Sequence, residues 1–138
     1  MFPVSPMPRA QLLVACAALL GYRFEARVLA ACCDVTEAQA LCVLRRACRR
    51  GLFVCESARE RRYRFCHALY RSAIRESLEP ARANALHARI ATTLEALSDP
   101  QFGSEILAYH WSRAGDGVRA RRCRRRAAVE ARRLGTSS

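Results

Sequence analysis

The sequence predicts a mainly helical protein with one short β-hairpin. Of its 138 residues, 51% are hydrophobic, which excludes a disordered chain. Six glycines and five prolines leave few of the turns that a β-rich fold needs. Apolar residues recur at three- and four-residue spacing along most of the chain. At this length we expect one domain with a helical extension, and no room for two catalytic domains.

Three helices are expected first, at about residues 9–20, 25–33 and 37–50. Thr36 and Gln39 have the spacing of a capping box, which places the start of the third helix. The side chains expected to face the core are Leu12, Leu13, Cys16, Leu19, Leu20, Val28, Leu29, Cys32, Ala40, Leu41, Leu44, Ala47 and Cys48.

A β-hairpin is expected after the third helix, with strands at 52–55 and 63–66 around a polar turn. The second strand, YRFC, alternates aromatic and polar residues, as a half-buried strand does. Three helices followed by a two-stranded wing predict a winged helix, which we place at residues 9–78.

Two helices are expected directly after the hairpin. The first runs from His67 to Leu78, and Pro80 ends it and opens a connecting helix within residues 79–97. The apolar positions expected to face inward are Leu69, Tyr70, Ala73, Ile74 and Leu78 in the first, and Ala83, Leu86, Ile90, Leu94 and Leu97 in the second.

Residues 104–134 predict a helical hairpin of the size of one tetratricopeptide-like repeat. One such repeat cannot bury its apolar face without neighbouring repeats. The residues expected to face inward are Ile106, Leu107, His110, Trp111, Ala120, Cys123, Ala127 and Ala131. The leader MFPVSPMP and the final GTSS lack periodicity, and we expect both to be loose.

Of the eight cysteines, four fall on apolar helix stripes and are interpreted as small buried hydrophobes, namely Cys16, Cys42, Cys48 and Cys123. There is no CxxC pair, and we predict no metal site. The apolar run at 10–20 has the length of a signal-peptide core, but we favour a cytoplasmic location. No stretch reaches the roughly 18 apolar residues of a membrane span, so we expect a soluble protein without a membrane partner.

The sequence contains no constellation that predicts catalysis. Cys66 and His67 are neighbours that point to opposite sides in extended backbone, so they cannot pair as nucleophile and base. His87 and His110 lie beside apolar stripes and are expected to pack or to hydrogen-bond between helices. We therefore predict that the chain is not an enzyme in its own right.

Five motifs stand in a characteristic order, namely LLG, RGLF, YRFCHAL, EPARANALHARIA and AYHWSRAGD. Together they resemble the segment after the ATPase core of bacterial signal-transduction ATPases with numerous domains. That family includes large ATP-binding LuxR-type transcriptional regulators and adenylate-cyclase-linked ATPases. The resemblance covers about residues 9–134. It implies a winged-helix arm packed on a nucleotide-binding core, followed by a tetratricopeptide-like region that senses a ligand or protein.

The resemblance also implies one nucleotide-binding residue. In the family, a His at the end of the second wing strand reaches the phosphate of the bound nucleotide, and the matching position here is His67. His67 would open a helix, whose unpaired N–H groups and positive dipole end favour an anion. The alternative is that His67 only caps or packs locally. Ala68 follows, where some relatives have Asp.

This chain departs from the family in having no lysine and therefore no phosphate-binding loop of the GxxxxGK[ST] type. We expect ADP or ATP to be bound only through a nucleotide-binding ATPase core that another segment or chain supplies. No second helix-turn-helix follows the hairpin, so we expect a fragment or the downstream part of a split regulator.

The alternative is a stand-alone winged helix that binds nucleic acid. The net charge is +12, and all 24 basic residues are arginines, a bias that a GC-rich genome also produces. On the third helix the basic residues lie near its end, where they can contact phosphates but not bases. These residues are Arg45, Arg46, Arg49 and Arg50. A second cluster consists of Arg119, Arg121, Arg122, Arg124, Arg125, Arg126, Arg132 and Arg133.

Overall fold

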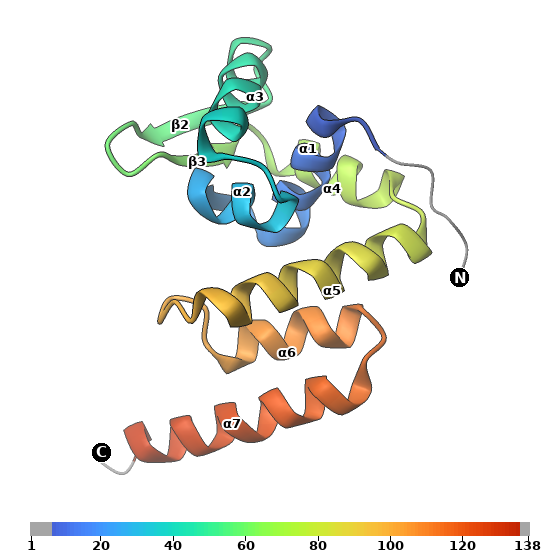
Figure 1. Cartoon of the computed structure of the whole chain (residues 1–138), viewed down its shortest axis with the longest axis vertical. Coiled ribbons are helices and arrows are strands. Elements are labelled where there is room, and N and C mark those ends of the chain that lie inside the picture. The colour runs from blue at the N-terminus through green and yellow to red at the C-terminus, as the bar shows by residue number, and fades with distance from the viewer. Residues whose placement is uncertain (1–6, 136–138) are drawn as a thin grey trace. The chain divides into compact units, whose positions relative to one another are not determined.

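The computed structural model describes residues 7–135 of the chain (Figure 1). Most of the predicted loose leader and C-terminal end falls on residues 1–6 and 136–138, outside the described part. The described residues form seven helices and one three-stranded antiparallel sheet, which confirms a mainly helical fold. The chain divides into two compact units, residues 1–82 and 83–138, which are described separately below.

The first unit begins with helices α1 (Arg9–Leu20), α2 (Ala26–Cys33) and α3 (Glu37–Arg49), close to the predicted positions. The predicted capping box starts α3. The Gln39 backbone N–H donates to the Thr36 hydroxyl over 3.1 Å, and the Thr36 N–H donates to the Gln39 side chain over 2.9 Å. Most of the predicted core positions on these helices are buried, and the rest are half-buried. Of the four cysteines predicted to be buried, Cys16 and Cys123 are buried, Cys48 is half-buried and Cys42 is exposed.

The sheet has three strands instead of the two predicted. Strands β2 (Phe53–Ser57) and β3 (Arg62–Phe65) form the expected hairpin, and β1 (Arg23–Glu25) pairs with the other edge of β3. The additional strand has only three residues, which is too short to show an alternating pattern in the sequence. Pairing on both sides makes β3 the central strand.

Four aromatic side chains pack between the sheet and the helices. Phe24 meets Phe53 edge to face at 5.2 Å, and Phe53 meets Phe65 in the same way at 4.9 Å. Tyr63 stacks on Phe24 at 6.3 Å. All four are buried. Edge-to-face pairs stabilise a fold beyond the area that they bury, so this aromatic cluster determines the position of β3.

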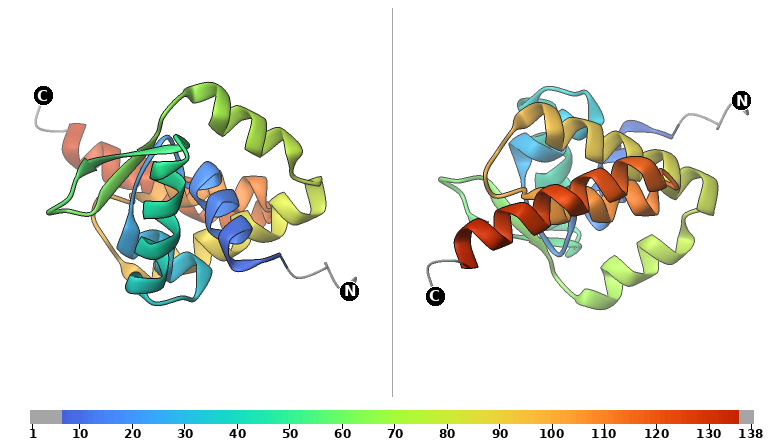
Figure 2. Two further views of the ribbon diagram at one scale, coloured as in Figure 1. Left: turned by 90° about the horizontal axis from the view of Figure 1, so that it is seen from above. Right: turned by 90° about the horizontal axis from the view of Figure 1, so that it is seen from below.

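Helix α4 (Ala68–Ser77) presents a different face to the unit from the one predicted. The structure buries none of its residues and half-buries Arg71, Ile74, Arg75 and, just beyond it, Leu78. Leu69 and Tyr70, predicted to face inward, are 78% and 44% exposed, and Ala73 is exposed too. The Arg71 Nε–H donates to the Ala18 carbonyl over 2.8 Å, so the polar edge of α4 lies against α1. Leu69, Tyr70 and Ala73 are thereby left exposed. Figure 2 shows the ribbon of α4 at the margin of the first unit.

The second unit contains helix α5 (Pro80–Leu97), which enters it from the first unit, and helices α6 (Ser104–Arg113) and α7 (Gly117–Gly135). Figure 1 shows α6 antiparallel to α7, whose C-terminal turns extend beyond α6. Ala131 is therefore exposed, although it was predicted to be buried. Ile106 and Leu97 are also partly exposed, whereas the neighbouring Leu86, Ile90, Leu94, Leu107 and Trp111 are buried as predicted.

Within residues 7–135, no helix combines the length and the apolar character that crossing a membrane would require.

Candidate functional site

His67 lies at the corner where strand β3 turns into helix α4. The Phe65 N–H donates to the Tyr22 carbonyl over 3.1 Å on one side of the strand end, and the Cys66 N–H donates to the Leu52 carbonyl over 2.8 Å on the other. His67 follows with extended backbone (φ −137°, ψ 142°) and is the N-cap residue of α4. The predicted strand-to-helix junction is therefore present at the predicted residue.

The imidazole of His67 is exposed and makes no capping hydrogen bond within the described structure. It meets the ring of Tyr70 edge to face, with 5.4 Å between the ring centroids. The first N–H groups of a helix have no partners within the helix, and they carry partial positive charge. An exposed imidazole, which can donate a hydrogen bond, thus lies beside a helix end that favours an anion.

An exposed apolar surface adjoins His67. We call Leu69, Tyr70 and Ala73 the outer face of α4. On the other side of the helix, α1 and α4 line a groove of about 530 Å³ that includes Val14 and Ile74. Helix α4 is therefore loosely packed within its own unit, and the three residues of its outer face are exposed.

The four arginines proposed for nucleic-acid binding lie on α3, where all are exposed. These are Arg45, Arg46, Arg49 and Arg50. None of them forms an ion pair with an acidic residue of the described chain. Arg61, in the turn between β2 and β3, forms an ion pair with Glu37 at the start of α3. The basic end of α3 is therefore not neutralised by neighbouring carboxylates.

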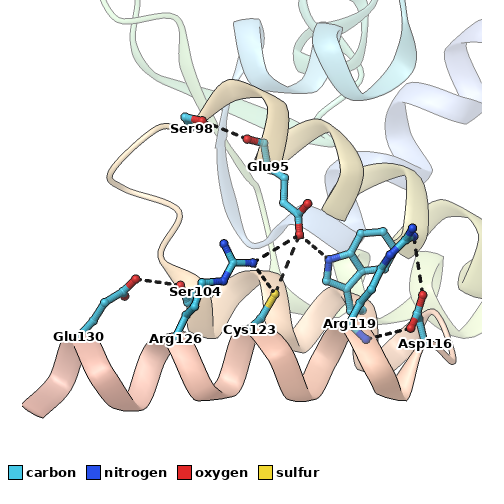
Figure 3. Close-up of polar contacts among 9 residues, drawn as sticks. Glu95, Ser98, Ser104, Asp116, Arg119, Cys123, Arg126 and Glu130 are labelled. Carbon is cyan, nitrogen blue, oxygen red and sulfur yellow. Dashed lines mark hydrogen bonds and ion pairs between the residues drawn. The ribbon is translucent and has the colours of Figure 1, made fainter.

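The arginines of α7 are partly engaged within the second unit (Figure 3). Glu95 of α5 accepts a 2.8 Å hydrogen bond from the Trp111 indole and lies 4.0 Å from the Arg126 guanidinium. Arg119 lies over the Trp111 ring at 4.8 Å and forms a 3.7 Å ion pair with Asp116. The remaining arginines without a carboxylate partner in the described part are Arg121, Arg122, Arg124, Arg125 and Arg132. The sequence analysis did not predict a role for Glu95. The indole N–H of a buried Trp usually requires an acceptor, and this requirement could have pointed to Glu95.

His87 and His110 hydrogen-bond between helices, as predicted. Their Nδ1 atoms lie 2.8 Å apart, and both side chains are buried at 3% and 2% exposure. In the neutral pair one ring donates and the other accepts. Burial, and secondly the charge of His87, lower the pKa of His110 from 6.5 to about 4. These two histidines join α5 to α6. A ligand-binding pair would face solvent, whereas both of these side chains are buried.

Cys66 and His67 are adjacent in sequence at the corner. Among residues 7–135 there is no group of three or more His, Cys, Asp or Glu side chains that could hold a metal ion.

No family model, no curated protein and no solved structure matches the chain.

The buried histidine pair predicts a pH dependence of stability. The folded-state pKa of His110 lies below its unfolded value, so its contribution is complete above about pH 6.5 and decreases as the pH falls towards 4. Across this window we expect a loss on the order of 3 kcal/mol. Urea unfolding followed by Trp111 fluorescence measures it.

The matched controls are His110→Gln, which should flatten the dependence between pH 6.5 and 5, and His67→Ala, which should leave it unchanged. Stability that is equal at pH 6.5 and pH 5 in the parent chain would contradict the assignment.

Proposed function

We propose that this chain is the regulatory, non-catalytic segment of a nucleotide-dependent signalling ATPase or transcriptional regulator. In this proposal the first unit is a winged-helix arm that docks on a separate nucleotide-binding core. The second unit begins a tetratricopeptide-like sensor region. The observation that carries the proposal is the exposed imidazole of His67 at the head of α4, directly beside the outer face of the same helix.

His67 supplies the contact to nucleotide. When a core presents a bound ADP at this corner, the imidazole N–H donates to a phosphate oxygen, and the N-terminus of α4 adds its positive dipole end. The extended backbone at His67 directs the chain out of the sheet before the helix begins. The resemblance of YRFCHAL to the family motif supports this role for the same residue.

The outer face of α4 supplies the contact to the core. Burying a large apolar side chain contributes roughly 1.5–3 kcal/mol, so covering Leu69 and much of Tyr70 would stabilise a docked state. The docking surface and the phosphate contact occupy the first turn of one helix. Loss of the nucleotide would therefore weaken docking, and the arm could report the nucleotide state.

The second unit supports a sensor role by its exposed apolar residues. Val129 and Leu134, in the C-terminal half of α7, are exposed. In a repeat array, this end would pack against a following helical pair. We place the ligand or protein partner of the system on such an array, and the whole assembly in the cytoplasm.

Replacing His67 by Ala should weaken ADP binding to the complex of this chain with a P-loop core by about tenfold. The reason is that a hydrogen bond to a charged phosphate contributes roughly 1.5–3 kcal/mol. Equilibrium dialysis of ADP, with and without the core protein, measures the change.

Leu69→Ala with Tyr70→Ala is the matched control in the same helix turn. It should weaken binding of the core with or without ADP, whereas His67→Ala should act only when ADP is present. ADP affinity unchanged by His67→Ala in a stable complex would remove the assigned role.

The alternative is a stand-alone basic winged helix that binds nucleic acid through α3. It is favoured by Arg45, Arg46, Arg49 and Arg50, which are exposed and have no carboxylate partner in the described structure. The start of α3, where base contacts usually originate, carries Glu37, which is paired with Arg61. Binding of this kind would be directed at phosphates and would not discriminate between sequences.

Changing these four arginines to Gln should reduce the salt dependence of duplex binding. The slope of log K against log salt should fall by roughly 0.9 for each lost phosphate contact. Fluorescence anisotropy with a random duplex at several salt concentrations measures it. The control neutralises Arg121, Arg122, Arg124 and Arg125 on α7, which removes the same charge. Equal slopes for both variants would show a general charge effect and would contradict an α3 interface.

A further inference from the structure

A small cavity in the first unit brings two thiols and three guanidinium groups together. It measures about 310 Å³ and lies between α3, strands β2 and β3 and the turn that joins the strands. Cys48 and Cys55 line it together with Tyr63. Its basic lining residues are Arg45, Arg49 and Arg61. The lining of this cavity does not include His67, so the cavity plays no part in the nucleotide contact proposed above.

A tight turn at the end of α3 places the two thiols on this cavity. The Gly51 N–H donates to the Cys48 carbonyl over 3.0 Å, and the Leu52 N–H donates to the Ala47 carbonyl over 3.0 Å. Gly51 has φ 83°, a left-handed conformation that glycine adopts without strain. Strand β2 therefore turns back beside the last turn of α3, and Cys55 stands in register with Tyr63 of β3.

The two thiols differ in their surroundings. Cys55 is exposed, whereas Cys48 is half-buried. Burial, and secondly the nearby Cys55, raise the pKa of the Cys48 thiol. A reagent in solution can therefore reach Cys55. Cys48 lines the same cavity, is less accessible and remains protonated because its pKa is raised.

The charge of the lining selects the reagent. Arg45 and Arg49 have no carboxylate partner in the described structure, whereas Arg61 forms an ion pair with Glu37. Two unneutralised guanidinium groups attract anions and raise their local concentration. A small disulfide that carries carboxylates fits this environment better than a neutral or cationic one.

We propose that Cys48 and Cys55 form a redox-active dithiol that anionic low-molecular-weight disulfides, with oxidised glutathione as the probe, convert to an intramolecular disulfide.

The reaction proceeds in two exchanges. Cys55 loses its proton, its sulfur attacks one sulfur of the glutathione disulfide, and the S–S bond of the reagent breaks. The first glutathione leaves as a thiolate and takes up a proton. Cys48 then loses its proton and attacks the Cys55 sulfur, and the second glutathione leaves in the same way. The protein dithiol is oxidised by two electrons, and the glutathione disulfide is reduced to two thiols.

The product would link the last turn of α3 to the middle of β2 and so fix the wing on the helix. The exposed thiol acts first because the reagent can reach it. The half-buried Cys48 acts second, and its target is the mixed disulfide that Cys55 forms with glutathione. This target is held in the same cavity, and its closeness offsets the small thiolate fraction that the raised pKa of Cys48 allows.

Peptide mapping tests the pair. The reduced full chain is treated with oxidised glutathione, blocked with an alkylating reagent and digested with trypsin without reduction. We expect the peptide Ala47–Arg49 to be linked to Gly51–Arg59, and the exposed Cys42 of α3 to stop at a glutathione adduct. Cys48→Ser should leave Cys55 as the adduct, and Cys42→Ser should leave the linked peptide unchanged.

Two outcomes would overturn the proposal. One is a native chain in which Cys55 retains glutathione while Cys48 is alkylated. The other is a linked peptide that forms equally well in guanidinium chloride, because the fold would then not place the two thiols.

The effect of the basic lining on the choice of disulfide can be tested separately. The double variant Arg45→Gln with Arg49→Gln should slow the reaction of Cys55 with oxidised glutathione severalfold, and should not slow the reaction with the cationic disulfide cystamine. Equal rates for the variant and the parent chain with glutathione, or equal slowing with both reagents, would overturn the choice of an anionic substrate.

Discussion

The packing of four aromatic rings around strand β3 is the constraint on which the candidate site depends. Phe24, Phe53, Tyr63 and Phe65 bury the inner face of the sheet, and β3 pairs with a strand on each side. A slip of one residue would turn these rings to solvent, so the register of β3 is strongly fixed. Because the strand cannot slide, its end is fixed as well, and His67 follows at the surface as the first residue of the corner.

Helix α4 follows from that corner with its polar edge inward. The hydrogen bond from Arg71 to the Ala18 carbonyl satisfies a carbonyl near the end of α1 and turns Leu69 and Tyr70 outward. A helix of this kind adds little to the stability of its own unit, because it buries no residue fully. It instead combines an apolar surface and an anion-favouring N-terminus in one turn. This combination distinguishes α4 from the other helices of the first unit, which are packed on the core.

Periodicity predicted the positions of the helices and of the hairpin, but it could not predict which neighbour each face would meet. The whole stripe of α4 was predicted to face inward because an apolar face normally covers a core. The structure shows that α1 meets only Ile74 and Leu78 of that stripe, together with Arg71. Strand β1 was missed because three residues carry no pattern. Ala131 lies on the correct stripe of α7, beyond the end of the helix that would have covered it. The sequence predicted that His87 and His110 would pack or hydrogen-bond between helices, because a histidine beside an apolar stripe needs a partner. It did not predict that they would bond to each other.

The most direct measurement of the central claim is amide hydrogen exchange across residues 62–78 of the chain in isolation. The account predicts that β3 exchanges slowly, as α1 does, because it is hydrogen-bonded on both sides. Helix α4 should exchange much faster than α1 and become protected only when a partner covers its outer face. Protection of α4 equal to that of α1 in the isolated chain would show that the helix already has its partner, and would contradict the account.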